Sequence, residues 1–272
     1  MPIKLIMYKK YNLQVIKEKN MYNEKEHDFY NNIKNWDFSM IKYVEESLTS
    51  WDMYKYLEQI ATKDSVVLDL GTGGGENVLK YYPTVKKVIA TDFSQEMINT
   101  ANENLARTNR DYITFRIMDN LKIDTPDDYF DIVVARHTCI DAKQIYKTLK
   151  KNGTLIVRGV DKLDCWKLKL MFKCGQAYSD LLPISLIDYE NIINAGFKNV
   201  ELIPIHIREY YQTKEDLIAL LLKTPILAEF SEVDNNLRRT LDMKILDKYI
   251  EENTTDKGIL LIRRYYGITA RK

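Results

Sequence analysis

A buried strand followed at once by a glycine-rich turn constrains the fold of this chain more than any other feature. Residues 66–75 read Val-Val-Leu-Asp-Leu-Gly-Thr-Gly-Gly-Gly. The apolar run predicts a strand, and Gly71, Gly73 and Gly75 predict the turn after it. Residues 76–82 then predict a short helix. A turn of this kind lets a cofactor lie against bare backbone, with the amides of the helix N-terminus available to an anion.

The spacing of the glycines argues against two common nucleotide-binding loops. A Gly-x-Gly-x-x-Gly dinucleotide loop needs a third glycine, where helix and strand pack closely. That position is Glu76 when counted from Gly71 and Val78 when counted from Gly73. A Gly-x-x-x-x-Gly-Lys loop is also absent. The sequence instead reads Asp-x-Gly-x-Gly-x-Gly from Asp69, an acid that would repel a pyrophosphate and could pair with a cationic amino group.

Alternating strands and helices are predicted after the turn. Strands are expected at residues 85–91, 113–117, 131–135, 154–157, 200–208 and 259–263, the last of which could run on to residue 270. Helices are expected at residues 95–105, 142–149, 185–195 and 213–222. Ser94 is expected to cap the first helix and Ser185 the third. Lys150-Lys151-Asn152-Gly153 is expected to form the turn before the strand at 154–157.

From these motifs in this order, residues 61–161 resemble the class I S-adenosylmethionine-dependent methyltransferases. The resemblance implies an α/β fold, with a Rossmann-like, doubly wound, mostly parallel sheet of seven strands whose last strand is antiparallel. It also implies S-adenosyl-L-methionine as the cofactor. The activity that it implies is in-line transfer of the cofactor's methyl group to an acceptor.

The resemblance assigns cofactor-binding roles to residues at the strand ends. Those implied to hold the methionine end are Asp69, Gly71, Thr72, Gly73 and Gly75. Those implied to hold the nucleoside are Asp92 for the ribose hydroxyls, Phe93 for the adenine face, and Asp119, Asn120 and Leu121 for the adenine edge. Ala135, Arg136 and His137 are implied to lie beneath the sulfonium. Taken alone, a strand-end acid is equally a helix cap or turn residue, and an aromatic in this place is commonly core.

Catalytic and acceptor-binding residues are less distinct. His137, just after the fourth strand, has a side chain suited to a general base, although it could instead hydrogen-bond backbone in the cofactor pocket. Arg136 could hold a carboxylate or phosphate of the substrate, or pair with Asp141. Trp36 and Trp51 could wall the substrate site or pack on the core.

Composition bounds the partners and the location. The 272 residues include 40 Lys and Arg and 39 Asp and Glu, a net charge of +1. This balance argues against a nucleic-acid partner, which usually requires a basic face. The cysteines and histidines show no metal-binding spacing, so we expect no metal site. No apolar run approaches the ~20 residues that cross a membrane. We see no signal peptide, and we therefore expect a cytoplasmic protein without a membrane partner.

The remaining sequence predicts additions around the core. Residues 1–60 are expected to form an N-terminal helical lid segment, and residues 61–272 the methyltransferase domain. Further lid helices are expected near 161–182 and 213–257. We expect a small-molecule acceptor, because the Asn/Asp-Pro-Pro-Tyr signature of enzymes that methylate exocyclic amino groups of bases is absent after the fourth strand. The alternatives are ribosomal RNA or another macromolecule, bound through the lysines of 162–173, and a non-catalytic regulator that binds the cofactor. The oligomeric state is not readable from the sequence.

Overall fold

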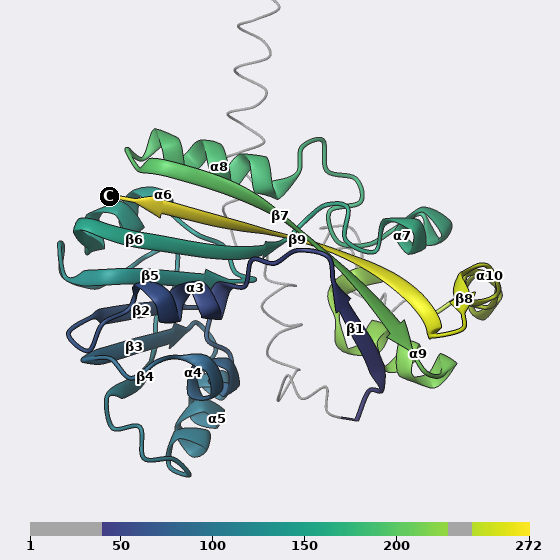
Figure 1. Ribbon diagram of the computed structural model, residues 1–272, viewed down its shortest axis with the longest axis horizontal. Helices are drawn as coiled ribbons and strands as arrows, with labels where there is room; N and C mark the ends of the chain where they lie inside the picture. Colours follow the sequence, from purple (N-terminus) through teal and green to yellow (C-terminus); the bar gives the residue numbers. More distant parts are fainter. Residues whose placement is uncertain (1–39, 228–240) are drawn as a thin grey trace, which may run out of the picture.

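A nine-stranded mixed sheet organises the molecule (Figure 1). The computed structural model describes residues 40–227 and 241–272. The sheet has the order β1-β7-β9-β6-β5-β2-β3-β4, and β8 pairs with β9. The strands are β1 (Tyr43–Ser47), β2 (Val66–Leu70), β3 (Lys87–Asp92), β4 (Ile113–Ile117), β5 (Phe130–Arg136), β6 (Leu149–Val160), β7 (Lys198–Tyr211), β8 (Thr254–Thr255) and β9 (Gly258–Arg271).

The core of the sheet is parallel, and its last strand is not. β2 lies between β3 and β5 and is parallel to both, and β4 and β6 continue the parallel order outward. β9 inserts between β6 and β7 and is antiparallel to each. The predicted Rossmann-like α/β fold with an antiparallel last strand is therefore confirmed. The two strands beyond the predicted seven are β1, which forms the edge of the sheet antiparallel to β7, and the short β8.

Helices cover both faces of the sheet, as the apolar runs of its parallel strands require. They are α3 (Met53–Ile60), α4 (Glu76–Tyr81), α5 (Gln95–Leu105), α6 (Ala142–Thr148), α7 (Trp166–Phe172), α8 (Ile184–Asn194), α9 (Lys214–Lys223) and α10 (Met243–Asn253), with a 3₁₀ turn, η1 (Pro225–Leu227). Along β2, Leu68 packs in the same cluster as Ile145 of α6 and Ile192 of α8, whereas Val67 packs in the cluster that holds Leu57 of α3 and Ile98 of α5.

A third apolar cluster lies beyond the parallel strands. β7 and β9 each have 14 residues and run past the end of β6 (Figure 1). Around their far halves pack α7, α9, η1 and α10, through residues such as Leu168, Leu217 and Leu246. The long β7–β9 ladder thus joins the parallel core to a group of helices that face the carboxyl ends of its strands.

The sequence misplaces several local features. Tyr43–Ser47 lies within the segment expected to be helical, but it is a strand, because it pairs along β7. The expected turn at 150–153 lies inside β6, where the ladder with β5 is irregular between Phe130 and Ile132. Ser185 does not cap α8, because Pro183 occupies the cap position; the Ser185 hydroxyl donates to Asp161 at 2.9 Å instead. Ser94 caps α5 as predicted.

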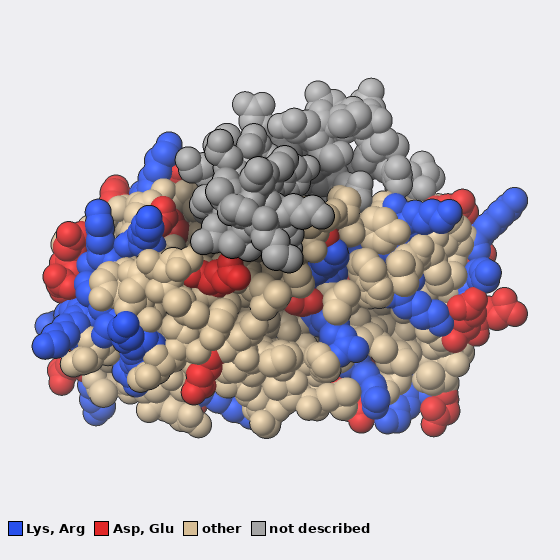
Figure 2. Space-filling model, turned by 90° about the horizontal axis from the view of Figure 1, so that it is seen from above, with Lys and Arg blue, Asp and Glu red and all other residues tan. Residues whose placement is uncertain are grey.

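Charge is mixed over the visible surface. On the face drawn in Figure 2, lysine and arginine side chains alternate with acidic ones around both ends of the molecule. No helix within residues 40–227 and 241–272 is long and apolar enough to cross a membrane.

Candidate functional site

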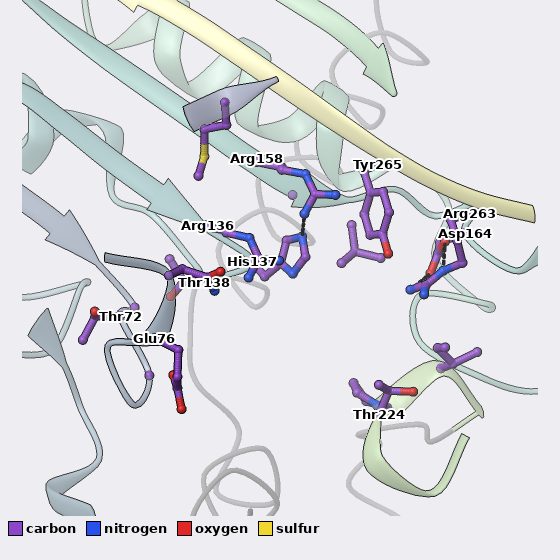
Figure 3. Close-up of a pocket in the computed structure, with 18 of the residues that line it drawn as sticks. Thr72, Glu76, Arg136, His137, Thr138, Arg158, Asp164, Thr224, Arg263 and Tyr265 are labelled. Atoms are coloured by element: carbon purple, nitrogen blue, oxygen red, sulfur yellow. Dashed lines mark hydrogen bonds and ion pairs between the residues drawn. The ribbon is translucent and has the colours of Figure 1, made fainter. Parts of the chain in front are cut away.

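A cavity of about 530 Å³ opens at the carboxyl ends of the parallel strands. Its walls include the last residues of β2, β3, β5 and β6, together with residues of β1, β9, α9 and η1. Open α/β sheets bind ligands at the carboxyl ends of their strands. The site lies where successive strands are added to opposite sides of the first strand. Here β2 is that strand, since β3 and β5 flank it. Figure 3 shows the side chains that face this space.

The glycine turn forms one end of the cavity in a backbone conformation that requires glycine. Gly71, Gly73 and Gly75 have φ of 75°, 59° and 78°. A Cβ on Gly71 would lie 2.7 Å from Cβ of Thr138, so the site excludes a side chain there for steric reasons too. Gly71 and Gly73 line the cavity together with Thr72. Gly75 does not, because it packs against Phe115, 2.6 Å from where its Cβ would be.

Asp92 at the end of β3 fixes the position of this turn. One carboxylate oxygen accepts the amide of Gly73 at 2.9 Å, and the other accepts the amide of Ser94 at 3.0 Å. Asp92 is 8% exposed and lines the cavity, and burial raises the pKa of its carboxyl. Because each carboxylate oxygen has about two acceptor positions, Asp92 retains capacity for hydroxyl donors. Phe93, half-buried, lies beside it on the cavity wall.

Asp69 at the end of β2 is the second acid at this end. It is 5% exposed, and the hydroxyl of Tyr82 donates to one of its oxygens. Burial raises the pKa of Asp69 to about 6, while hydrogen bonding and the charge of Arg136 oppose that rise. At neutral pH the group is therefore mostly ionised, beside a cation and facing the cavity.

Arg136, at the end of β5, lies between the glycine turn and the rest of the cavity (Figure 3). Its Nε is buried and has no hydrogen-bond partner within residues 40–227 and 241–272. The expected alternative, an ion pair with Asp141, is not formed; Asp141 instead caps α6 by accepting the amides of Lys143 and Gln144.

Several residues predicted at the site do not reach the cavity. Those absent from its walls are Gly75, Asp119, Asn120, Leu121, Ala135 and Trp51. Asp119 accepts the amide of Leu121 at 2.9 Å as a turn acid would, and Asn120 donates to Thr138 at 2.8 Å. Trp51 packs over Gly267 on the sheet, whereas Tyr54 from α3 lines the cavity. Trp36 lies outside the described residues.

His137 is joined to Arg158 rather than left free to accept a proton. Arg158, at the carboxyl end of β6, approaches Nε2 of His137 to 2.8 Å through Nη1. Because a guanidinium only donates, Nε2 is the acceptor and the neutral ring carries its proton on Nδ1. His137 is exposed to the cavity; desolvation by the protein around the rest of the ring, then the charges of Arg136 and Arg158, lowers its pKa well below 6.5. Both side chains lie against Tyr265 of β9, His137 stacking on it with ring centroids 5.4 Å apart.

A buried ion-pair network stands at the far end of the cavity. Arg263 of β9 bonds Asp164 through Nε at 3.0 Å and Glu209 through Nη1 at 3.1 Å. Across the β1–β7 pair, Glu45 lies directly opposite Glu209 and also lines the cavity. Burial and the charge of Glu209 raise the pKa of Glu45.

Sequence reasoning missed most of this far end. Arg158 follows the predicted strand 154–157 by one residue, so its place at a strand end was a usable signal. Glu45, Tyr265 and Arg263 had none, because only the β1–β7–β9 ladder brings them to the cavity. Among the described residues, no group of three or more His, Cys, Asp or Glu side chains could hold a metal ion.

Comparison with known proteins adds a domain assignment. Residues 67–154 match the family model described as a methyltransferase domain. The chain is 33% identical over 122 residues to the ribosomal protein L11 methyltransferase of Alkaliphilus oremlandii, which is 42% of this chain and 39% of that protein. It is 27% identical over 98 residues to the uncharacterized methyltransferase YcgJ of Bacillus subtilis, 34% of this chain and 39% of the relative. The chain thus spans well under half the length of these curated relatives.

The fold is shared more widely. A protein from Bacillus halodurans C-125, described as a candidate methyltransferase, superposes with a TM-score of 0.54 at 20% identity, over 80% of this chain and 98% of that chain. At this identity the likeness establishes the fold alone. The structural likeness covers more of the chain than the matched domain does.

Proposed function

We propose that this chain, a class I S-adenosylmethionine-dependent methyltransferase by its domain at residues 67–154 and by its fold, transfers a methyl group to a small-molecule acceptor. One observation carries the proposal. The cavity at the strand ends has two chemically different parts, a glycine turn with two acids and a distant group of arginines and aromatic rings. A volume of about 530 Å³ suits a cofactor with a small second ligand rather than a macromolecular surface.

The residues at the glycine end fit S-adenosylmethionine. The turn offers backbone that no side chain shields, and Asp69 offers a carboxylate to the amino group of the methionine moiety. Arg136, with its buried Nε unpartnered in the described part of the chain, suits the methionine carboxylate. Asp92 retains acceptor capacity for the ribose hydroxyls, and Phe93 suits the adenine face. Contacts of Asp119, Asn120 and Leu121 with the adenine edge stay a prediction.

Bound S-adenosylmethionine supplies a methyl group that its positive sulfur already activates. The work left to this chain is to hold the acceptor in line with that methyl group and to keep water out. Tyr54, Tyr265 and Ile226 give the cavity apolar walls suited to that purpose. A hydroxyl, thiol or ammonium acceptor must also lose a proton.

Glu45 suits the role of proton acceptor better than His137. Glu45 lines the cavity, and partial desolvation, then the charge of Glu209, raises the pKa of its carboxyl, which makes it a stronger base. The Nε2 lone pair of His137 already accepts from Arg158, and its low pKa makes it a weak base. We therefore propose that His137 orients Arg158. Glu45 accepts the proton that the methyl acceptor loses.

A protein acceptor is the second candidate, and the relatives named ribosomal protein L11 methyltransferase favour it. The similarity covers the domain that would bind the cofactor and 39% of the Alkaliphilus oremlandii protein. Because the similarity leaves more than half of each chain unmatched, the small-molecule proposal rests on the cavity. The mixed surface charge in Figure 2 gives no particular support to an RNA acceptor. A regulator that binds the cofactor without turnover would have no need of the far half of the cavity.

Calorimetric titration of the purified chain tests the proposal first. We expect S-adenosylmethionine and S-adenosylhomocysteine to bind and NAD not to bind. Incubation with labelled S-adenosylmethionine and pools of small amines, alcohols, thiols and carboxylic acids should then release S-adenosylhomocysteine with at least one pool. Absence of binding by both adenosyl ligands would overturn the cofactor assignment. Binding with turnover only on protein L11 would overturn the small-molecule acceptor.

A further inference from the structure

Arg158 is a cation that the fold leaves without a carboxylate. Among the described residues, its guanidinium forms a hydrogen bond only with His137, and its Cζ lies 4.2 Å from the centroid of the Tyr265 ring. Within residues 40–227 and 241–272, no acid lies within ion-pair distance of it. Arg158 is largely surrounded by protein, and burial lowers its pKa. A desolvated cation without a counter-charge costs free energy unless a ligand supplies the anion.

Two of the three acids at this end of the cavity, Asp164 and Glu209, are paired with Arg263. Arg263 holds Asp164 through two bonds, at 3.0 and 3.1 Å, and holds Glu209 at 3.1 Å. Glu45 faces the same space but makes no ion pair with Arg158 at 4.0 Å or less. The charge of Arg158 therefore remains available, although three carboxylates lie in the same wall.

His137 adds a second donor beside this cation. Its amide donates to the carbonyl of Arg158 at 2.8 Å, and its Nε2 accepts from the guanidinium at the same distance. The residue has φ of 53°, a value that is uncommon outside glycine, although histidine adopts it more often than most residues. The Nδ1–H of the neutral ring has no partner within the described part of the chain. A guanidinium and an imidazole N–H together suit an oxyanion.

Two neighbouring arginines separate the roles of the cofactor and the acceptor. Arg136 and Arg158 are partners in the β5–β6 register, so they stand side by side at the strand ends. Figure 3 shows Arg136 on the side of the cavity where Thr72 and Glu76 lie, Arg158 on the side of Tyr265, and His137 beside both arginines. A single cofactor carboxylate occupies one of the two cations. The other then awaits a second anion.

We propose that the methyl acceptor carries an oxyacid group, a carboxylate or a phosphate, that binds Arg158 and the Nδ1–H of His137 in the half of the cavity remote from the glycine turn. The inference rests on the proposed function, because it assigns the first arginine to the cofactor. It narrows the acceptor to small anionic molecules. Glu45, on the same side, lies where it can take the proton of such an acceptor.

Binding of simple anions to the chain saturated with S-adenosylhomocysteine tests the inference. The probes are inorganic phosphate and acetate, with acetamide as the neutral isostere of acetate. We expect one of the two anions to bind by calorimetry and acetamide not to bind. The stronger of the two identifies the oxyacid. Arg158→Met should lower the affinity for that anion at least about tenfold. Arg158→Lys should lower the affinity less, because lysine keeps the positive charge but lacks the planar guanidinium.

Matched controls separate this site from general charge and from the cofactor. Arg107→Met removes an equal charge from an exposed position after α5 and should leave anion affinity unchanged. The affinity of Arg158→Met for S-adenosylhomocysteine should stay within about twofold of the parent value, which also reports that the variant folds. Anion binding that is absent, or equal in parent and Arg158 variants, would overturn the inference while cofactor binding stands. Failure of the parent to bind S-adenosylhomocysteine would overturn the proposed function itself.

Discussion

Arg158 and His137 are joined twice, once between side chains and once between main chains, each time at 2.8 Å. The side-chain bond fixes the tautomer of the imidazole, because the guanidinium has no acceptor to offer. His137, which was expected to act as a general base, therefore positions Arg158 instead. His137 makes both bonds with a backbone φ of 53°.

Replacing His137 should change how stability depends on pH. The pKa of His137 is well below its ordinary 6.5 in the folded chain, so below pH 6.5 the unfolded chain takes up a proton that the folded chain refuses. The parent therefore loses stability as the pH falls from 6.5 toward the folded pKa. His137→Asn, which tolerates positive φ, should lack this contribution. Urea unfolding from pH 7.5 to 5 measures it. Parallel curves for parent and variant would contradict the tautomer assignment.

Asp69→Asn should stabilise the fold and weaken the binding of the cofactor. The pKa of Asp69 is about 6 in the folded chain, against an ordinary 3.8. Above pH 6 the carboxyl is ionised in both states, and its ionisation lowers the free energy of unfolding. This destabilisation disappears as the pH falls from 6 to 3.8. At pH 7 the amide should therefore add up to about 3 kcal/mol to the free energy of unfolding. Loss of the charge should weaken the binding of S-adenosylmethionine by about 1.5–3 kcal/mol. Urea unfolding and calorimetry measure the two effects, and a destabilised variant would refute the first.

Asp92→Ala should weaken the binding of S-adenosylhomocysteine for two reasons. It removes the acceptor for the ribose hydroxyls, and it releases the amide of Gly73, which Asp92 accepts at 2.9 Å. We expect a loss of about 1.5–3 kcal/mol for each charged hydrogen bond removed, read by calorimetry. Asp124→Ala serves as the control, since Asp124 is exposed and pairs with Arg116 away from the cavity. Equal affinities for the two variants would remove Asp92 from the site.

Gly71→Ala and Gly74→Ala should differ although the two glycines are three residues apart. At Gly71, φ is +75° and the new Cβ would meet Cβ of Thr138 at 2.7 Å. The backbone cost alone is about 1–2 kcal/mol, and the overlap would shift the turn and lower cofactor affinity. At Gly74, the nearest atom is the flexible end of the Glu76 side chain, which can move. Thermal unfolding and calorimetry of both variants test this. Equal losses would mean that the turn is not held by Gly71.

Arg263→Met should destabilise the far end of the cavity strongly. It leaves Asp164 and Glu209 buried without their cation, with side chains only 2% and 8% exposed. Removal of one partner from a buried ionic network costs about 3–5 kcal/mol. The same substitution at Arg116, whose ion pair with Asp124 is exposed to solvent, should cost about 1 kcal/mol or less. Urea unfolding at pH 7 compares them, and a loss at Arg263 no larger than that at Arg116 would show that the network contributes little.

The parallel half of the fold was predictable because its signals are local. The strand Val66–Leu70 and the helix Gln95–Leu105 with its Ser94 cap follow from apolar runs and capping chemistry within a few residues. The turn at Gly71 follows likewise from residues that tolerate positive φ. Where the sequence failed, a distant partner decided. Tyr43–Ser47 is a strand only because β7 offers an edge, and Ser185 turns to Asp161 because Pro183 already occupies the cap position.

The sequence by itself determined the order of the parallel strands' motifs, the glycine turn and the acids Asp69 and Asp92 that stand at strand ends. Each of these depends on neighbours in the chain, and parallel strands bring their carboxyl ends to one edge. Only the tertiary structure decided what faces them. Glu45, Arg158, Arg263 and Tyr265 lie far apart in the sequence, and the long β7–β9 ladder with β1 brings them to one cavity. Whether a charge there is paired, as for Arg263, or left for a ligand, as for Arg158, depends on contacts that no local pattern encodes.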